Sequence, residues 1–229
     1  GDRLILTGGE GDGKSTLLRQ IGVQASSGIH PFGGRSYEPL RVLDLDLENS
    51  DRQLKRELRP LRIAAGNGYG GGLIVKVRAE GIDLLDPADV AWFLALVAEH
   101  DPDLLITGPA YKMAAGNPID EEPARIVAGY LDRVRVQHRC AVLLEAHCRH
   151  AGNSRTRPER PYGASLWLRW PEFGLYLAPD GALRHWRGPR DITRAWPALL
   201  HRGGAWPWTP VARERDQLWA KIKAARAIS

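Results

Sequence analysis

The chain has 229 residues, which is long enough for one large α/β domain with a complete hydrophobic core, and we expect a single domain over residues 1–229. No apolar run approaches the roughly 20 residues that span a bilayer, and the first strand-like run begins at residue 3, so we expect a soluble, cytoplasmic protein with no membrane partner. Its 32 Lys and Arg exceed its 27 Asp and Glu, and the net charge of +5 permits a polyanionic partner without requiring one.

The first apolar run, "RLILT", leads into "GGEGDGKST" and then into the helix-like "STLLRQIGVQA". Gly8, Gly13, Lys14 and Ser15 match the pattern Gly-x-x-x-x-Gly-Lys-Ser/Thr in the strand, loop and helix context of a phosphate loop. Glycines allow backbone N–H groups to turn toward phosphates, and the helix N-terminus adds its positive end. We expect Lys14 to lie along the β- and γ-phosphates of ATP and the Ser15 hydroxyl to be a ligand of Mg²⁺. The predicted nucleotide-binding residues are Gly8, Gly9, Glu10, Gly11, Asp12, Gly13, Lys14, Ser15 and Thr16.

Further strand-like runs alternate with amphipathic stretches along the chain. The runs are "RVLDLDLE", "LIVKVR", "LLITG" and "AVLLEAH", and the stretches are 50–65, 87–99 and 121–138. This alternation predicts a mainly parallel sheet covered by helices. From residue 172, "EFGLYLAPDGALRHWRG" predicts an antiparallel hairpin at the sheet edge, and 211–226 a terminal helix. Because the chain opens almost on the phosphate-loop strand, one interpretation is that an N-terminal region of a larger protein precedes it.

Acidic residues follow the second predicted strand. Glu48 ends "RVLDLDLE", and ligands of open α/β sheets bind beyond the carboxyl ends of the strands, so Glu48 is the best candidate for the base that activates water. The alternative is a position beside the cap of the next helix, in "ENSDRQ". Asp44 and Asp46 share its strand parity and need partners, either a metal or a basic neighbour. A second acid should end the next apolar strand near the site, but this run, "DLLITGPAYKM", has Gly108 at the expected position.

The order of several segments resembles RecA-fold ATPases of the RepA and DnaB-like helicase group, in particular their phage-borne DnaB-like branch. The segments are the phosphate loop, "VLDLDLENSDRQLKRELR", "LLITGPAYKM", "GNPIDEEPARIVAGYLDRV", "CAVLLEAHCRH", "GAS" and "WRGPRD". The resemblance covers roughly residues 3–210. It implies a RecA-like P-loop core and a ring, of hexameric type, that hydrolyses ATP between subunits and translocates on single-stranded DNA.

The resemblance also assigns roles to individual residues. Lys14 and Ser15 match the phosphate and Mg²⁺ residues, and Glu48 matches the catalytic glutamate. His147 matches the polar sensor of the γ-phosphate. Arg187 resembles the basic residue that reaches the ATP of a neighbouring subunit, with Arg169 and Arg190 as rivals. Gly108 departs from the usual metal-side Asp, and Asp46 or Glu145 is expected to replace it.

Two predicted loops leave the same strand ends and are the expected contacts with DNA. They are 110–122, with Lys112, and 148–162, with Arg149, Arg155, Arg157 and Arg160. The alternative interpretation is a loop that is merely solvated. Six tryptophans are expected in the core: Trp167, Trp170, Trp186, Trp196, Trp206 and Trp208. Two competing functions remain open: a RecA- or RadA-like recombination or repair ATPase, and a nucleotide-binding adaptor with weak hydrolysis.

Overall fold

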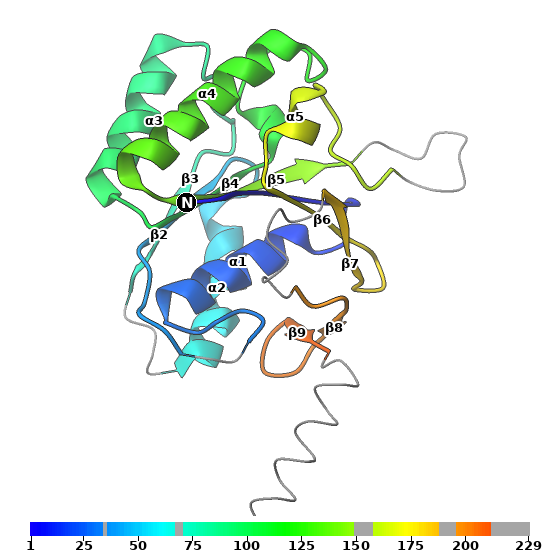
Figure 1. Cartoon of the computed structure of the whole chain (residues 1–229). Helices are drawn as coiled ribbons and strands as arrows, with labels where there is room; N and C mark the ends of the chain where they lie inside the picture. The colour runs from blue at the N-terminus through cyan, green and yellow to red at the C-terminus, as the bar shows by residue number, and fades with distance from the viewer. Residues whose placement is uncertain (34–35, 67–70, 149–157, 188–195, 212–229) are drawn as a thin grey trace, which may run out of the picture.

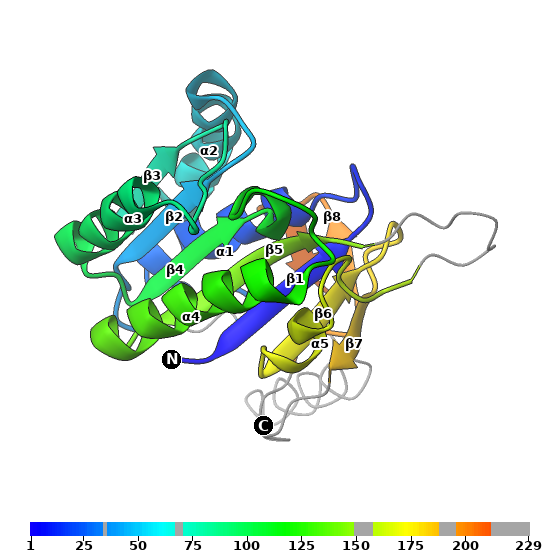
Figure 2. The same ribbon diagram turned by 90° about the horizontal axis from the view of Figure 1, so that it is seen from above.

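A seven-stranded sheet forms the centre of the protein (Figures 1 and 2). The structure is a computed structural model that describes residues 1–33, 36–66, 71–148, 158–187 and 196–211. The strands are β1 (Arg3–Gly8), β2 (Val42–Asp46), β3 (Leu73–Val77), β4 (Leu104–Gly108), β5 (Ala141–His147), β6 (Phe173–Leu177) and β7 (Leu183–Arg187). Their order in the sheet is β3-β2-β4-β5-β1-β6-β7. All neighbouring pairs are parallel except β6 and β7, which form the predicted antiparallel hairpin at the edge.

Helices cover both faces of this sheet. α1 (Lys14–Ser26) and α2 (Asp51–Ala65) lie on one face, and α3 (Pro87–His100), α4 (Glu121–His138) and the short α5 (Leu166–Arg169) lie on the other (Figure 1). A 3-10 turn, η2 (Ala110–Lys112), follows β4. The sheet is therefore the middle layer of three, and strand residues alternate between two cores: in β1, Ile5 faces the α3–α4 side while Leu4 and Leu6 face the α1–α2 side.

Local sequence signals explain where α2 and α3 begin. The Ser50 hydroxyl caps α2 by accepting from the Gln53 N–H, and the Asp86 carboxylate caps α3 by accepting from the N–H groups of Ala88 and Asp89. Pro87 occupies the first turn of α3, where its missing N–H costs nothing. The three amphipathic stretches predicted from the sequence are helices, and the five strand-like runs before residue 148 are strands.

A second, two-stranded sheet lies on the α1–α2 side. Its strands are β8 (Leu200–Arg202) and β9 (Trp208–Pro210) (Figure 1). The side chains of Leu200 and Trp208 belong to the same buried core as Leu17 and Leu18 of α1. The tryptophans mostly serve as core, as expected: Trp167, Trp170 and Trp208 are buried, and Trp186, Trp196 and Trp206 are half-buried. Apart from Val211, the predicted terminal helix 211–226 lies outside the described residues. Among the residues that the structure describes, no helix combines the length and apolarity that a membrane span needs.

Candidate functional site

The predicted phosphate loop connects β1 to α1 at the carboxyl edge of the sheet. Gly11 and Gly13 have φ angles of 77° and 91°, in the left-handed region that glycine adopts at little cost. Gly13 is the N-cap of α1, so the helix starts at Lys14 and directs its free N–H groups toward the loop. The loop therefore has the backbone geometry of an anion-binding turn at the point where the pattern predicts one.

Contacts within the loop hold it in shape. The Lys14 ammonium donates to the Gly9 carbonyl over 2.9 Å, and the Gly9 N–H donates to the Asp12 carboxylate over 2.6 Å. Lys14 is only 4% exposed although it carries a charge. A bound phosphate would offer the same donors a stronger acceptor, because hydrogen bonds between charged groups are about twice as strong as neutral ones.

The hairpin β8–β9 supports the loop from outside. The Trp208 indole N–H donates to the Gly13 carbonyl over 3.2 Å, and Arg202 donates to the Asp12 carbonyl over 2.8 Å. The Arg202 guanidinium also stacks on the Trp208 ring, 4.7 Å from its centroid. Gln20 on α1 exchanges two hydrogen bonds with the Trp208 backbone. A segment almost 200 residues away in sequence thus fixes the loop.

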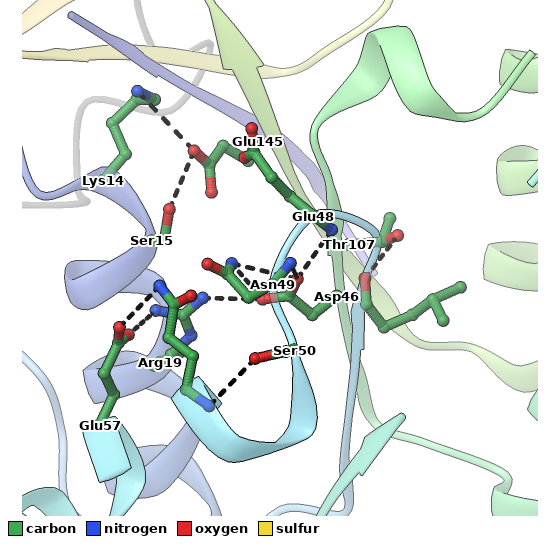
Figure 3. A network of polar contacts seen from close by, with 12 residues as sticks. Lys14, Ser15, Arg19, Asp46, Glu48, Asn49, Ser50, Glu57, Thr107 and Glu145 are labelled. Carbon is green, nitrogen blue, oxygen red and sulfur yellow. Dashed lines mark hydrogen bonds and ion pairs between the residues drawn. The ribbon is translucent and has the colours of Figure 1, made fainter. Parts of the chain in front are cut away.

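Glu145 reaches from β5 to the head of α1 (Figure 3). Its carboxylate accepts from the Ser15 hydroxyl over 3.1 Å and lies 3.7 Å from the Lys14 ammonium. Burial raises the pKa of Glu145, and the Lys14 charge and the Ser15 hydrogen bond act in the opposite direction. The sheet order explains the contact, because β5 lies directly beside the phosphate-loop strand β1.

Asp46, the sequence candidate for a metal ligand, is bonded to the protein on both carboxylate oxygens. One oxygen accepts from the N–H groups of Glu48 and Asn49, and the other accepts from Arg19 over 2.7 Å. The Asn49 side chain donates to both oxygens (Figure 3). Although burial raises the pKa of Asp46, these hydrogen bonds outweigh it and hold the pKa below its usual value. Asp46 therefore organises the turn after β2.

Asp44 precedes Asp46 by two residues on β2, and both side chains line the same pocket as Arg19. Asp44 is buried there, and the prediction that Asp44 and Asp46 lie on one face of the strand is correct. Burial raises the pKa of Asp44 to about 7, against the opposing charge of Arg19. Arg19 also pairs with Glu57 on α2. Arg19 is thus the basic neighbour that these buried acids require.

Glu48, the candidate base, lies two residues beyond the end of β2 and is exposed at the mouth of the site. The Tyr111 hydroxyl, from the turn after β4, donates to the Glu48 carboxylate over 3.4 Å. The Tyr111 ring meets the His147 ring edge-on at 5.6 Å between centroids. His147, the candidate sensor, pairs in register with Gly8 at the start of the phosphate loop. Glu48, Tyr111 and His147 therefore form one chain of contacts beside the loop.

Other predicted residues lie outside this group. Lys112 donates to the Ala79 carbonyl over 2.7 Å, Arg160 is exposed, and Arg187 donates to the Leu168 carbonyl of its own chain over 2.7 Å. Arg169, a rival of Arg187, donates to the Ser165 hydroxyl over 3.3 Å. The remaining predicted arginines, Arg149, Arg155, Arg157 and Arg190, lie outside the described residues.

Sequence reasoning missed several residues of the site: Arg19, Tyr111, Arg202 and Trp208. Arg19 had a local signal, because it lies four residues after Ser15 and so on the same face of α1. Within the described residues, no group of three or more His, Cys, Asp or Glu side chains is arranged to hold a metal ion alone. A metal here would need ligands from a nucleotide as well.

Comparisons with known proteins agree with this geometry. A family model described as AAA domain (AAA_25) matches residues 1–153, which include the phosphate loop, Glu48 and His147. The fold is similar to that of a KaiC-like protein from the hyperthermophilic archaeon Pyrococcus horikoshii OT3, with a TM-score of 0.57 and 15% identity over 92% of this chain and 89% of that chain. No curated protein sequence matches the chain. The chain therefore belongs to the AAA_25 family of AAA domains and is a P-loop ATPase of the RecA-like fold.

Proposed function

We propose that this chain is the motor domain of a DNA helicase of the DnaB and RepA-like type, which forms a ring and uses ATP to translocate along single-stranded DNA. ATP is the substrate, and water is the nucleophile. The water oxygen forms a bond to the γ-phosphorus, the bond to the bridging β–γ oxygen breaks, and ADP and phosphate are released. Glu48 accepts the proton that the water loses.

Other groups on this chain would bind and orient the triphosphate. Lys14 and the N–H groups of the loop would hold the β- and γ-phosphates, with Trp208 and Arg202 keeping the loop in shape. Mg²⁺ fits the same place, because the Ser15 hydroxyl and a neighbouring carboxylate are the oxygen donors that it prefers. Bound with ATP, it would neutralise charge on the phosphate oxygens.

The observation that carries the proposal is the contact chain from Glu48 through Tyr111 to His147. Tyr111 opens the segment that leaves β4, and His147 ends β5 just before the arginine-rich segment 148–162. A change in the positions of Glu48 and His147 around the γ-phosphate would therefore be transmitted first to the two segments expected to contact DNA. Such a link is what a motor needs to convert hydrolysis into movement.

The surface between these two segments suits a single strand. A groove there is lined by Tyr111, Gly116, Asn117 and Tyr162, and both tyrosines are exposed. Exposed aromatic rings stack on bases regardless of sequence, and arginines such as Arg160 neutralise phosphates. The proposal assigns ATP to the interface between subunits, with Arg187 as the candidate basic residue supplied by the neighbour.

One observation favours a second function, a nucleotide-binding adaptor with weak hydrolysis. The strand β4 ends in Gly108 and so brings no carboxylate to the metal side of the site. An adaptor would bind ATP in the phosphate loop but would show no acceleration of hydrolysis by DNA.

A hydrolysis assay with and without single-stranded DNA, followed by unwinding of a forked duplex, tests the proposal. We expect DNA to stimulate hydrolysis, and neutralising Arg155, Arg157 and Arg160 together to weaken DNA binding while basal hydrolysis survives. The log–log salt slope of binding should fall by about 0.7 for each lost phosphate contact. The matched control neutralises three exposed arginines of α2: Arg52, Arg56 and Arg59. Equal loss of DNA binding in both triple variants, or hydrolysis indifferent to DNA, would contradict the proposal.

A further inference from the structure

Gly108 adopts a backbone conformation and a location that exclude a side chain. Its φ of 143° is one that residues with a Cβ rarely adopt. A Cβ built on Gly108 would lie 2.7 Å from the Glu145 Cβ and 2.9 Å from the Glu145 carbonyl oxygen, closer than real Cβ atoms approach. The end of β4 therefore cannot carry an acidic side chain unless β5 shifts, because the clashing atoms are the Cβ and the backbone of residue 145.

Glu145 lies beside Gly108 and faces the phosphate loop. Thr107 pairs with Leu144 across β4 and β5, so Gly108 and Glu145 follow as neighbours. Leu144 and Ala146 belong to the α3–α4 core, which directs Glu145 to the opposite face, where Ser15 lies 3.1 Å from its carboxylate. Glu145 is 7% exposed, and a carboxylate that deeply buried needs a cationic or hydroxyl partner.

The other acids of the pocket are less suited to hold a metal. The pocket between β2, β4, β5 and α1 is lined by Ser15, Arg19, Asp44, Asp46 and Glu145 among others. Both oxygens of Asp46 already accept hydrogen bonds from Arg19 and the turn after β2. Asp44 pairs with Ile106 and so lies two residues before the end of β2, where Asp46 pairs with Gly108. Of the described acids that line this pocket, Glu145 is the one that accepts a hydrogen bond from the Ser15 hydroxyl.

We propose that Glu145 is the acid that holds Mg²⁺ together with Ser15, so that the metal-side carboxylate has moved from β4 to β5, beside the glycine that ends β4. The inference rests on the proposed binding of ATP in the phosphate loop. It also gives Glu145 a second effect: the carboxylate lies 3.7 Å from Lys14 and competes with phosphates for its ammonium. Without a metal ion, Glu145 therefore opposes nucleotide binding.

Binding experiments with Mn²⁺, which substitutes for Mg²⁺ and has a paramagnetic signal, test the inference without hydrolysis. Titration of protein into Mn²⁺ and a non-hydrolysable ATP analogue gives the affinity of the metal complex, and a fluorescent analogue in EDTA gives the affinity of the metal-free nucleotide. We expect Glu145→Gln to weaken the Mn²⁺ complex about tenfold or more. The same variant should bind the metal-free nucleotide as tightly as the parent or several-fold more tightly.

Two further variants keep the test decisive. Glu99→Gln removes an exposed carboxylate near the end of α3, away from the site, and should keep the parent affinity for the Mn²⁺ complex. Glu145→Asp keeps the charge but shortens the side chain, so this variant should fold. Its affinity for the Mn²⁺ complex should lie between that of the parent and that of Glu145→Gln. Parent-like Mn²⁺ affinity in both Glu145 variants would overturn the inference while leaving nucleotide binding intact. Failure of the parent protein to bind the analogue at all would instead refute the proposed function.

Discussion

Trp208 offers a sharp test of how the phosphate loop is supported, because its indole both fills space and donates a hydrogen bond. It is 2% exposed, donates to the Gly13 carbonyl over 3.2 Å, and its ring lies 3.0 Å from where a Cβ on Gly13 would stand. Trp208→Phe keeps an aromatic ring but removes the donor. The lost hydrogen bond costs about 1 kcal/mol and the smaller ring about another 1 kcal/mol.

A loss of about 2 kcal/mol corresponds to a fall in Tm of roughly 4–8 °C for a chain of this length. Differential scanning fluorimetry with and without an ATP analogue measures it, and the rise in Tm caused by the analogue should also shrink, because the loop is less well ordered before binding. Trp206→Phe, at a half-buried position of the same hairpin, is the matched control and should change Tm less. A Trp208→Phe protein with parent Tm and parent nucleotide affinity would refute the supporting role of the hairpin.

Three further predictions concern other parts of the molecule. Gly108→Ala should destabilise the fold by about 2–4 kcal/mol in urea unfolding, since its Cβ meets Glu145; parent stability would contradict the steric argument. Burial raises the pKa of Glu172, but hydrogen bonds from Arg3 outweigh it and lower the pKa from 4.5 to about 2, so the pair stabilises the fold above pH 4.5 and loses this effect as pH falls toward 2. Glu172→Gln should therefore lower the free energy of unfolding by about 1–2 kcal/mol at pH 7, a figure reduced for partial solvent exposure. It should also weaken the fall in stability between pH 4.5 and pH 2, and an unchanged fall would refute the pairing. Lys14→Ala should abolish hydrolysis and weaken binding of a fluorescent ATP analogue, and retained hydrolysis would contradict the assigned loop.

Much of the fold was predictable because its signals are local. The helices at 51–65, 87–100 and 121–138 follow amphipathic stretches, the first two with capping side chains at their starts, and the parallel strands follow short apolar runs between them. The phosphate loop was predictable for the same reason, since glycines at this spacing permit the positive φ angles that the turn needs. Strand β2 ends at Asp46, two residues earlier than predicted, because the turn that Asp46 organises begins there.

The partners of the buried acids were not predictable in the same way. Parity along β2 correctly placed Asp44 and Asp46 on one face, but it could not choose between a metal and Arg19 as the partner of Asp46. The contact between Glu145 and Ser15 depends on strand order, which brings β5 beside β1 although 130 residues separate the two side chains. Packing of Trp208 on the phosphate loop depends on a similar long-range arrangement.

Steady-state ATP hydrolysis by the parent protein and by Glu48→Gln, each with single-stranded DNA present, tests the central claim most directly. We expect Glu48→Gln to bind the nucleotide almost normally, because Glu48 stands at the mouth of the site, and to hydrolyse ATP about two or more orders of magnitude more slowly. A Glu48→Gln protein that hydrolyses ATP at the parent rate would contradict the assignment of the base and, with it, the account of this site as the centre of a DNA-driven ATPase.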